Sequence, residues 1–116
     1  MFTLASSHHS PRRGVIITPH GELATPFFMP DATRATVRGL SARSLQTLGL
    51  PALVVNTYHL LLQPGAEHIA KAGGVHTFMH WDKPVLSDSG GYQVFSLIHK
   101  NPALGKITEE GAEFRS

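Results

Sequence analysis

The chain has 116 residues, of which 41% are hydrophobic and 16% are charged, and its formal net charge at pH 7 is +2. This balance is ordinary for one folded domain and excludes a disordered or strongly charged chain. No window approaches the roughly 18 apolar residues of a membrane-spanning helix. The sequence contains no cysteine, and its first residues lack a basic start followed by an apolar core, so we expect a cytoplasmic protein without a secretory signal.

The first part of the chain predicts a β-hairpin. Residues 15–18 and 23–29 are strand-like, and Pro19-His20-Gly21-Glu22 between them has the composition of a turn. Two strand-like runs joined by so short a turn are typical of an antiparallel pair.

A helix is expected next, over residues 42–48. Ser41 is a suitable N-cap, and Gly49 fits the position just after a helix end. Leu45 and Leu48 would share one face of this helix.

The middle of the chain alternates short apolar runs with helical ones. The pattern predicts a strand, a helix closed by a glycine pair, a short turn or helix, and a second strand, over residues 52–55, 66–71, 75–79 and 83–87. Strands that alternate with helices are typical of α/β proteins with parallel strands. Residues 98–106 follow no recognisable pattern, and we expect a loop there.

The stretch Asp88-Ser89-Gly90-Gly91-Tyr92 follows the second of these strands and presents a carboxylate, a flexible turn and an aromatic ring. Ligands of parallel α/β proteins bind at the carboxyl ends of strands. Right-handed crossovers would place Asn56, which follows the first strand, at the same sheet edge as Asp88. Both residues are therefore candidates to line one pocket. Asp88-Ser89-Gly90-Gly91 is also compatible with an ordinary turn, and Asn56 could instead tie down its own loop.

A longer series of motifs resembles the tRNA-guanine transglycosylase family. The series comprises Asn56-Thr57-Tyr58-His59-Leu60, Gln63-Pro64-Gly65, Ala72-Gly73-Gly74-Val75-His76, Trp81-Asp82 and the Asp88 stretch continued by Gln93. Segments at 13–30, 36–40 and 107–116 also fit, so the resemblance covers nearly the whole chain and is closer to the bacterial and eukaryotic enzymes than to the archaeal ones. Asp31-Ala32 departs from the usual Val-Gly.

The resemblance implies a (β/α)8 TIM barrel preceded by a small antiparallel hairpin. The hairpin would occupy about residues 13–30, and the first barrel units about residues 31–116. A complete barrel needs about 250 residues, so we expect about three barrel strands here, an incomplete barrel and an uncovered apolar face. We interpret the sequence as the N-terminal portion of a longer protein or as the product of a truncated gene.

The resemblance also implies an activity, the exchange of guanine at the tRNA wobble position for a 7-deazaguanine (preQ1 or queuine) in queuosine biosynthesis. Family enzymes use one aspartate as the nucleophile at the ribose and a second to handle protons and recognise the purine. Asp88 matches the second, and no residue of this chain matches the nucleophile, so we expect the isolated chain to be inactive. The implied partners are the tRNA anticodon loop and a guanine or 7-deazaguanine base, and the complete protein could be a homodimer.

The residues after Asp88 have implied roles in the same pocket. Ser89, Gly90 and Gly91 would shape the pocket floor, with the glycines letting the base lie against the backbone. Tyr92 would stack on the purine, although an aromatic at this position could instead belong to the core.

Metal binding is not expected in this chain. His76 and His80 have the spacing that places two imidazoles on one helix face, but no acidic residue lies between them, and Gly73-Gly74 disfavours a long helix there. The resemblance implies a structural zinc held by cysteines and a histidine in the C-terminal part of the complete protein, and so no cofactor within this chain.

Two alternatives to the enzyme remain. One is a non-catalytic, accessory-subunit relative that contributes an RNA contact or a dimer surface, against which the presence of Asp88 argues. The other is a small stand-alone purine-binding α/β module, which requires that 116 residues fold stably alone. Arg34, Arg38 and Arg43 are candidate phosphate contacts, although most surface arginines are simply solvated.

Overall fold

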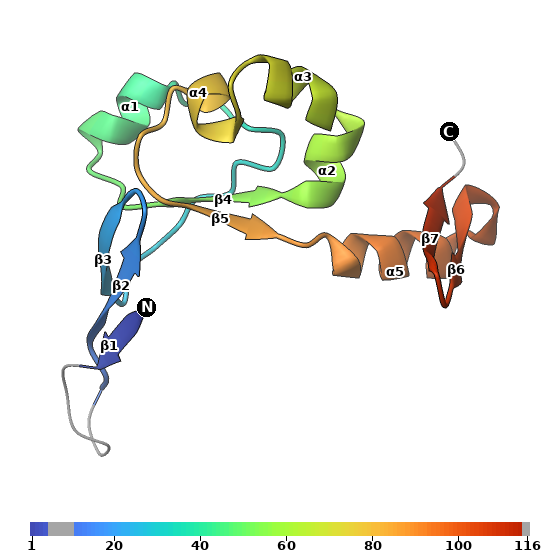
Figure 1. Ribbon diagram of the computed structural model, residues 1–116, viewed down its shortest axis with the longest axis horizontal. Helices are drawn as coiled ribbons and strands as arrows, with labels where there is room; N and C mark the ends of the chain where they lie inside the picture. Colours follow the sequence, from blue (N-terminus) through green and yellow to red (C-terminus); the bar gives the residue numbers. More distant parts are fainter. Residues whose placement is uncertain (5–10, 115–116) are drawn as a thin grey trace.

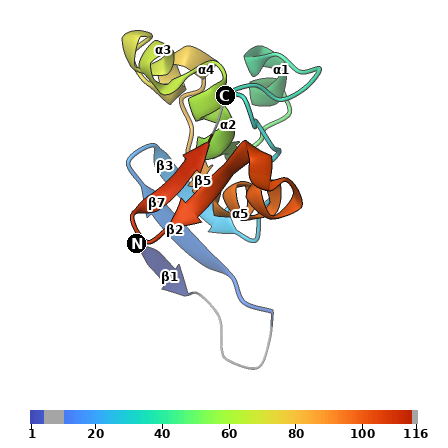
Figure 2. The same cartoon turned by 90° about the vertical axis from the view of Figure 1, so that its right-hand side faces the viewer.

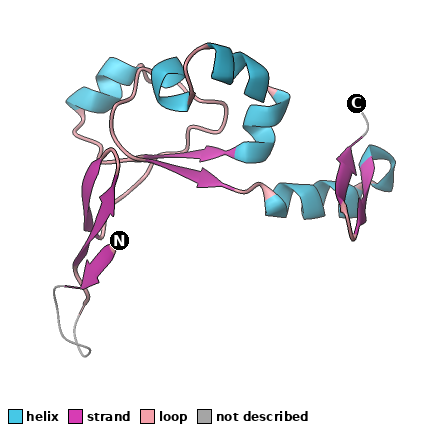
Figure 3. Ribbon diagram, in the orientation of Figure 1, coloured by secondary structure: helices cyan, strands magenta, loops and turns pink. Residues whose placement is uncertain are grey.

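The computed structural model describes residues 1–4 and 11–114, so Arg115 and Ser116 of the last motif segment lie outside the described residues. Helices and strands alternate through the middle of the chain (Figure 3), which confirms the α/β prediction. The elements are β1 (Phe2–Leu4), β2 (Gly14–Thr18), β3 (Gly21–Thr25), α1 (Ala42–Thr47), β4 (Leu53–Asn56), α2 (Thr57–Leu62), α3 (Ala66–Lys71), α4 (Val75–Met79), β5 (Val85–Asp88), α5 (Gly91–Lys100), a 3-10 turn η1 (Pro102–Leu104), β6 (Gly105–Thr108) and β7 (Gly111–Phe114). No helix in the described ranges is both long and apolar enough to cross a membrane.

Two parallel strands form the centre of the fold. β4 pairs with β5 so that Leu53 lies opposite Val85 and Asn56 opposite Asp88. On the other edge of β4, Asp31 forms a single parallel bridge with Val54. Parallel pairing among the described residues thus consists of two strands and one bridge, and the three barrel strands expected from the sequence stay a prediction. Prolines cannot donate to a ladder, so Pro30 beside the bridge helps to keep the third strand short.

The core lies between this small sheet and the helices. Figure 1 places α1 to α4 on one side of the β4–β5 layer, and Figure 2 shows the same four helices above β5. The buried cluster comprises Ala32, Ala35, Leu45, Leu53, Val55, Met79 and Trp81. Trp81 is 2% exposed and still satisfies its polar atom, because Nε1 donates to the Pro84 carbonyl at 3.2 Å. Leu86 on β5 is 52% exposed, so part of the apolar surface of this strand is uncovered.

The N-terminal hairpin is confirmed. β2 and β3 are antiparallel, and Thr18 pairs with Gly21 across a two-residue turn of Pro19 and His20. The second strand ends at Thr25, earlier than predicted, because Pro26 has no N–H to continue the ladder. The sequence analysis missed β1, which pairs with the outer edge of β2.

The helix predictions from residue 41 to residue 79 are largely confirmed. Ser41 caps α1 by accepting from the Ser44 N–H at 3.1 Å. α1 ends at Thr47, one residue early, so Leu48 does not share the buried face and is 64% exposed, whereas Leu45 is 3% exposed. α3 has the predicted bounds, and α4 resolves the predicted turn or helix as a helix.

Two helices were not predicted. α2 begins directly after β4, and α5 begins inside the glycine-containing stretch after Asp88. The expected loop over residues 98–106 is wrong, because α5 continues to Lys100 and is followed by η1 and the start of β6. Val94 and Ile98 are one helical turn apart, and Ile98 is buried, so packing of this face favours the helix. Figure 1 shows α5 and the β6–β7 hairpin beyond the carboxyl ends of β4 and β5.

Candidate functional site

Asn56 and Asp88 meet at the carboxyl ends of the two parallel strands. Each is the last residue of its strand, and the register places them side by side. The Asn56 Nδ2 donates to Asp88 Oδ2 at 2.6 Å. The prediction that both residues reach one sheet edge is therefore confirmed, with the correction that Asn56 ends β4 and Asp88 ends β5 instead of following these strands.

A second contact fixes the orientation of the Asn56 amide. Its Oδ1 accepts from the His59 N–H at 3.2 Å, so Asn56 is also the N-cap of α2. Because an oxygen must face that N–H, the NH₂ group is directed at the carboxylate. Asn56 is 6% exposed, and burial with both ends bonded makes it a rigid support. One oxygen of Asp88 is thereby held, and no described residue bonds the other.

Asp88 faces a small hollow of about 280 Å³. The lining residues are Asp31, Thr33, Val54, Val55, Asn56, His59, Asp88 and Gln93. Its volume is near the lower end of the roughly 300–1,000 Å³ typical of ligand pockets, so it suits one small ring system. Val54 and Val55 are its apolar lining residues and the others are polar, so the hollow offers a ligand mainly hydrogen-bonding groups.

Gln93 is a polar lining residue for which the sequence suggested no role. It comes from the first turns of α5, and its Oε1 is buried without a hydrogen-bond partner among the described residues. Buried acceptors normally have a partner, so this oxygen can accept from a ligand N–H in the hollow. The only signal in the sequence was its place in the Asp88 motif.

The other predicted site residues do not line this hollow. Ser89 Oγ accepts from the Gly91 N–H at 3.3 Å and so stabilises the start of α5. Gly90 is buried at φ +75°, where an added Cβ would lie 2.5 Å from the Tyr58 Cβ. It packs against the start of α2 and supports the Asn56 side of the site. Tyr92 is 75% exposed, so the alternative of a core aromatic is wrong.

The histidines and arginines singled out in the sequence lie elsewhere. His76 is on α4 and His80 is its C-cap, and among the described residues no group of three or more histidine and acidic side chains could hold a metal. With no cysteine in the chain, the residues present do not fit the structural zinc that the resemblance implies. Arg34 donates to Gln63 Oε1 at 3.1 Å, whereas phosphate contacts by Arg34, Arg38 or Arg43 stay predictions.

Comparisons with known proteins point to one family. A family model described as queuine tRNA-ribosyltransferase matches residues 7–116. Proteins named queuine tRNA-ribosyltransferase from Rickettsia typhi, Lactococcus lactis subsp. cremoris and Koribacter versatilis are 54%, 53% and 52% identical over 99%, 94% and 99% of this chain. The aligned parts are 31%, 28% and 29% of those proteins. The chain thus spans about 30% of the length of these relatives.

Proposed function

Because the chain belongs to the queuine tRNA-ribosyltransferase family, we propose that it forms the purine-recognising part of a tRNA-guanine transglycosylase. The reaction is the exchange of guanine at the wobble position of tRNA for a 7-deazaguanine. The observation that carries the proposal is the Asn56–Asp88 pair at the carboxyl edge of β4 and β5, facing a hollow that suits one heterocycle. The two parallel strands and the Asp31 bridge would be the first strands of a (β/α)8 barrel.

Asp88 would act on the base itself. Its free oxygen can accept from N–H groups of a guanine-like ring, while Asn56 holds the other oxygen. During exchange the departing guanine must gain a proton on the nitrogen that leaves the ribose, and the incoming base must lose one from the same position. A positioned carboxyl group can serve both transfers as general acid and general base. The covalent intermediate on the ribose requires a second aspartate, for which this chain has no match.

The remaining site residues would complete the purine environment. Ser89 and Gly91 begin α5 and Gly90 packs behind Asn56, so these residues would hold the pocket floor in place. Tyr92 is exposed and available to stack on a base that has left the anticodon loop, where bases are already unpaired. A cytoplasmic location and a homodimer of the complete protein belong to the same proposal.

A chimera tests the proposal directly. This chain would replace the matching segment of the Rickettsia typhi relative, with which it shares 54% identity over 115 residues. We expect the purified chimera to incorporate radiolabelled guanine into unmodified tRNA, and the 116-residue chain alone to incorporate none. A folded but inactive chimera would contradict the proposal and favour the accessory-subunit alternative.

Substitutions of Asn56 separate its two contacts. Asn56→Ser keeps an oxygen that can cap α2 but removes the amide that holds Asp88. Hydrogen bonds to charged groups contribute about 1.5–3 kcal/mol, so guanine exchange by the chimera should fall about 10- to 100-fold. Asn56→Ala removes both contacts and should also lower the free energy of unfolding by about 1 kcal/mol more than Asn56→Ser does.

Incorporation of tritium-labelled guanine into tRNA and urea unfolding of the two substituted chimeras would measure these effects. Equal exchange by Asn56→Ser and the unsubstituted chimera would show that the amide does not position Asp88.

A further inference from the structure

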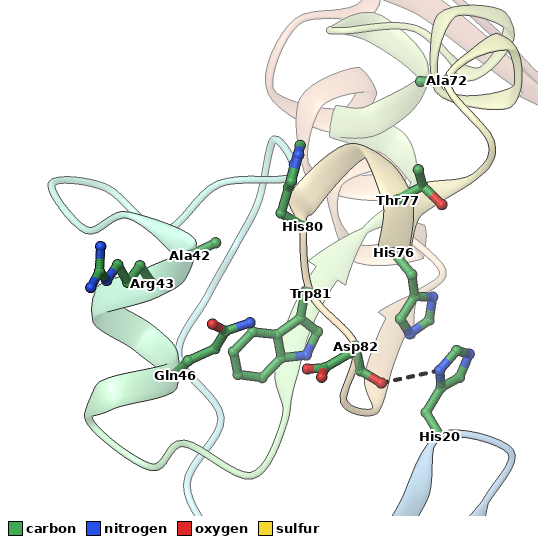
Figure 4. A pocket seen from close by; sticks show the side chains of 10 residues that line it. All are labelled: His20, Ala42, Arg43, Gln46, Ala72, His76, Thr77, His80, Trp81 and Asp82. Carbon is green, nitrogen blue, oxygen red and sulfur yellow. Dashed lines mark hydrogen bonds between the residues drawn. The ribbon is translucent and has the colours of Figure 1, made fainter.

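His20 and His76 lie face to face although 56 residues separate them in the chain. Their ring centroids are 3.7 Å apart and the ring planes are inclined by 10°. His20 is in the turn between β2 and β3, and His76 is on α4. Both residues line an open hollow of about 1020 Å³, and Figure 4 shows their rings next to each other. This contact joins the N-terminal hairpin to the helical layer.

A hydrogen bond defines the tautomer of the neutral His20 ring. Its Nδ1 lies 3.3 Å from the Asp82 backbone carbonyl, which can only accept, so Nδ1 carries a hydrogen. In the neutral ring, Nε2 is then the unprotonated nitrogen. The turn is thus held by one ring contact and one hydrogen bond.

His76 is the ring that resists a second proton. Its Nε2 is buried and has no hydrogen-bond partner among the described residues, so a proton added there would be buried without an acceptor. Burial lowers the pKa of the His76 imidazole below its usual value of 6.5, and the neighbouring His20 lowers that pKa further. A hydrogen bond with the Lys83 backbone acts in the opposite direction. The neutral ring is therefore favoured while the turn is docked.

Other titratable groups line the same hollow. They are Arg43 on α1, His80 at the end of α4 and the Asp82 carboxylate, whose negative charge is opposite to that of the Arg43 guanidinium. Lys83 follows Asp82, but its Nζ donates to the Leu50 carbonyl at 2.9 Å.

We propose that His20 and His76 form a pH-sensitive latch, which holds the β2–β3 turn against α4 while at most one of the two rings is positively charged, and releases the turn when both rings are. One cationic ring can stack on a neutral one, but two cationic rings in contact repel each other. The lowered pKa of His76 means that the docked state binds fewer protons than the released state. Docking is therefore complete above about pH 6.5 and is lost as the pH falls through the lowered pKa. The latch does not rest on the proposed enzyme function, because it lies at the amino end of β5, away from Asp88.

Nuclear Overhauser effects between the two imidazole rings test the latch in the complete protein. We expect strong ring-to-ring effects at about pH 8 and at least a tenfold loss by about pH 5. His20→Phe and His76→Phe each keep a flat ring and remove one charge, so their ring contacts should persist over the whole range. His80→Asn is the matched control. Asn tolerates the left-handed backbone of His80 at φ +52°, and both stacked rings remain. This variant should lose its ring-to-ring effects over the same pH range as the unsubstituted protein.

Three results would overturn the latch. The first is an absence of ring-to-ring effects at about pH 8. The second is their persistence after chemical shifts show that both rings are protonated. The third is loss of the native Trp81 Nε1–H resonance at the same pH as the ring-to-ring effects. This N–H donates to the Pro84 carbonyl within the core, so its loss would report general unfolding instead of release of the turn.

Discussion

Replacing Asp88 with asparagine in the chimera is expected to lower guanine exchange by a factor of about 10² to 10⁴, the contribution typical of a positioned acid or base. The substitution preserves the shape of the side chain that lines the hollow of about 280 Å³. It cannot accept or return a proton. It also removes the charged acceptor that the Asn56 amide contacts at 2.6 Å. Activity should therefore fall much more than stability does.

Two measurements separate chemistry from folding in this experiment. Single-turnover incorporation of labelled guanine would report the chemical step, and urea unfolding would report stability. Asp82→Asn is the matched control, because this exposed aspartate lies before β5, at the opposite end of the strand from Asp88. Full exchange by the Asp88→Asn chimera would remove Asp88 from the catalytic role, whereas an equal loss in Asp82→Asn would indicate a general effect of charge.

The parts predicted correctly from sequence are those governed by local signals. The helix Ala66–Lys71 is bounded by glycines on both sides, and its bounds were found without error. Ser41 was identified as an N-cap because that role depends on a contact only three residues away. Asn56 and Asp88 each follow a short apolar run, and the handedness of parallel crossovers was enough to place them at one edge.

The parts that were missed depend on contacts that are distant in sequence or on residues with two roles. β1 forms only because Phe2 can pair with Ile16, and no local pattern reveals that pairing. α2 starts directly after its N-cap Asn56, whose place in the motif obscured its capping role. Gln93 belongs to the site because α5 turns its side chain back toward β5, and a helix beginning at two glycines is disfavoured by local propensity.

Gly90→Ala is expected to lower the free energy of unfolding by about 2–5 kcal/mol. The left-handed backbone at φ +75° costs a non-glycine residue about 1–2 kcal/mol. The added Cβ would lie 2.5 Å from the Tyr58 Cβ and 2.9 Å from the Tyr58 backbone nitrogen, and overpacking of this kind costs about 1–3 kcal/mol more. Neither contact is with a flexible side-chain end, so the start of α2 must shift.

Gly49→Ala supplies the matched comparison, because Gly49 has φ +68° and an added Cβ would meet no atom within 4 Å. It carries the backbone cost without the clash, so urea unfolding should show a loss of about 1–2 kcal/mol. Displacement of α2 by Gly90→Ala would also move the Asn56 cap, whose Oδ1 would lie 3.3 Å from the new Cβ. Guanine exchange by the chimera should consequently fall with Gly90→Ala and stay unchanged with Gly49→Ala. Equal stability losses in the two variants would show that the close approach of Gly90 to Tyr58 does not support the site.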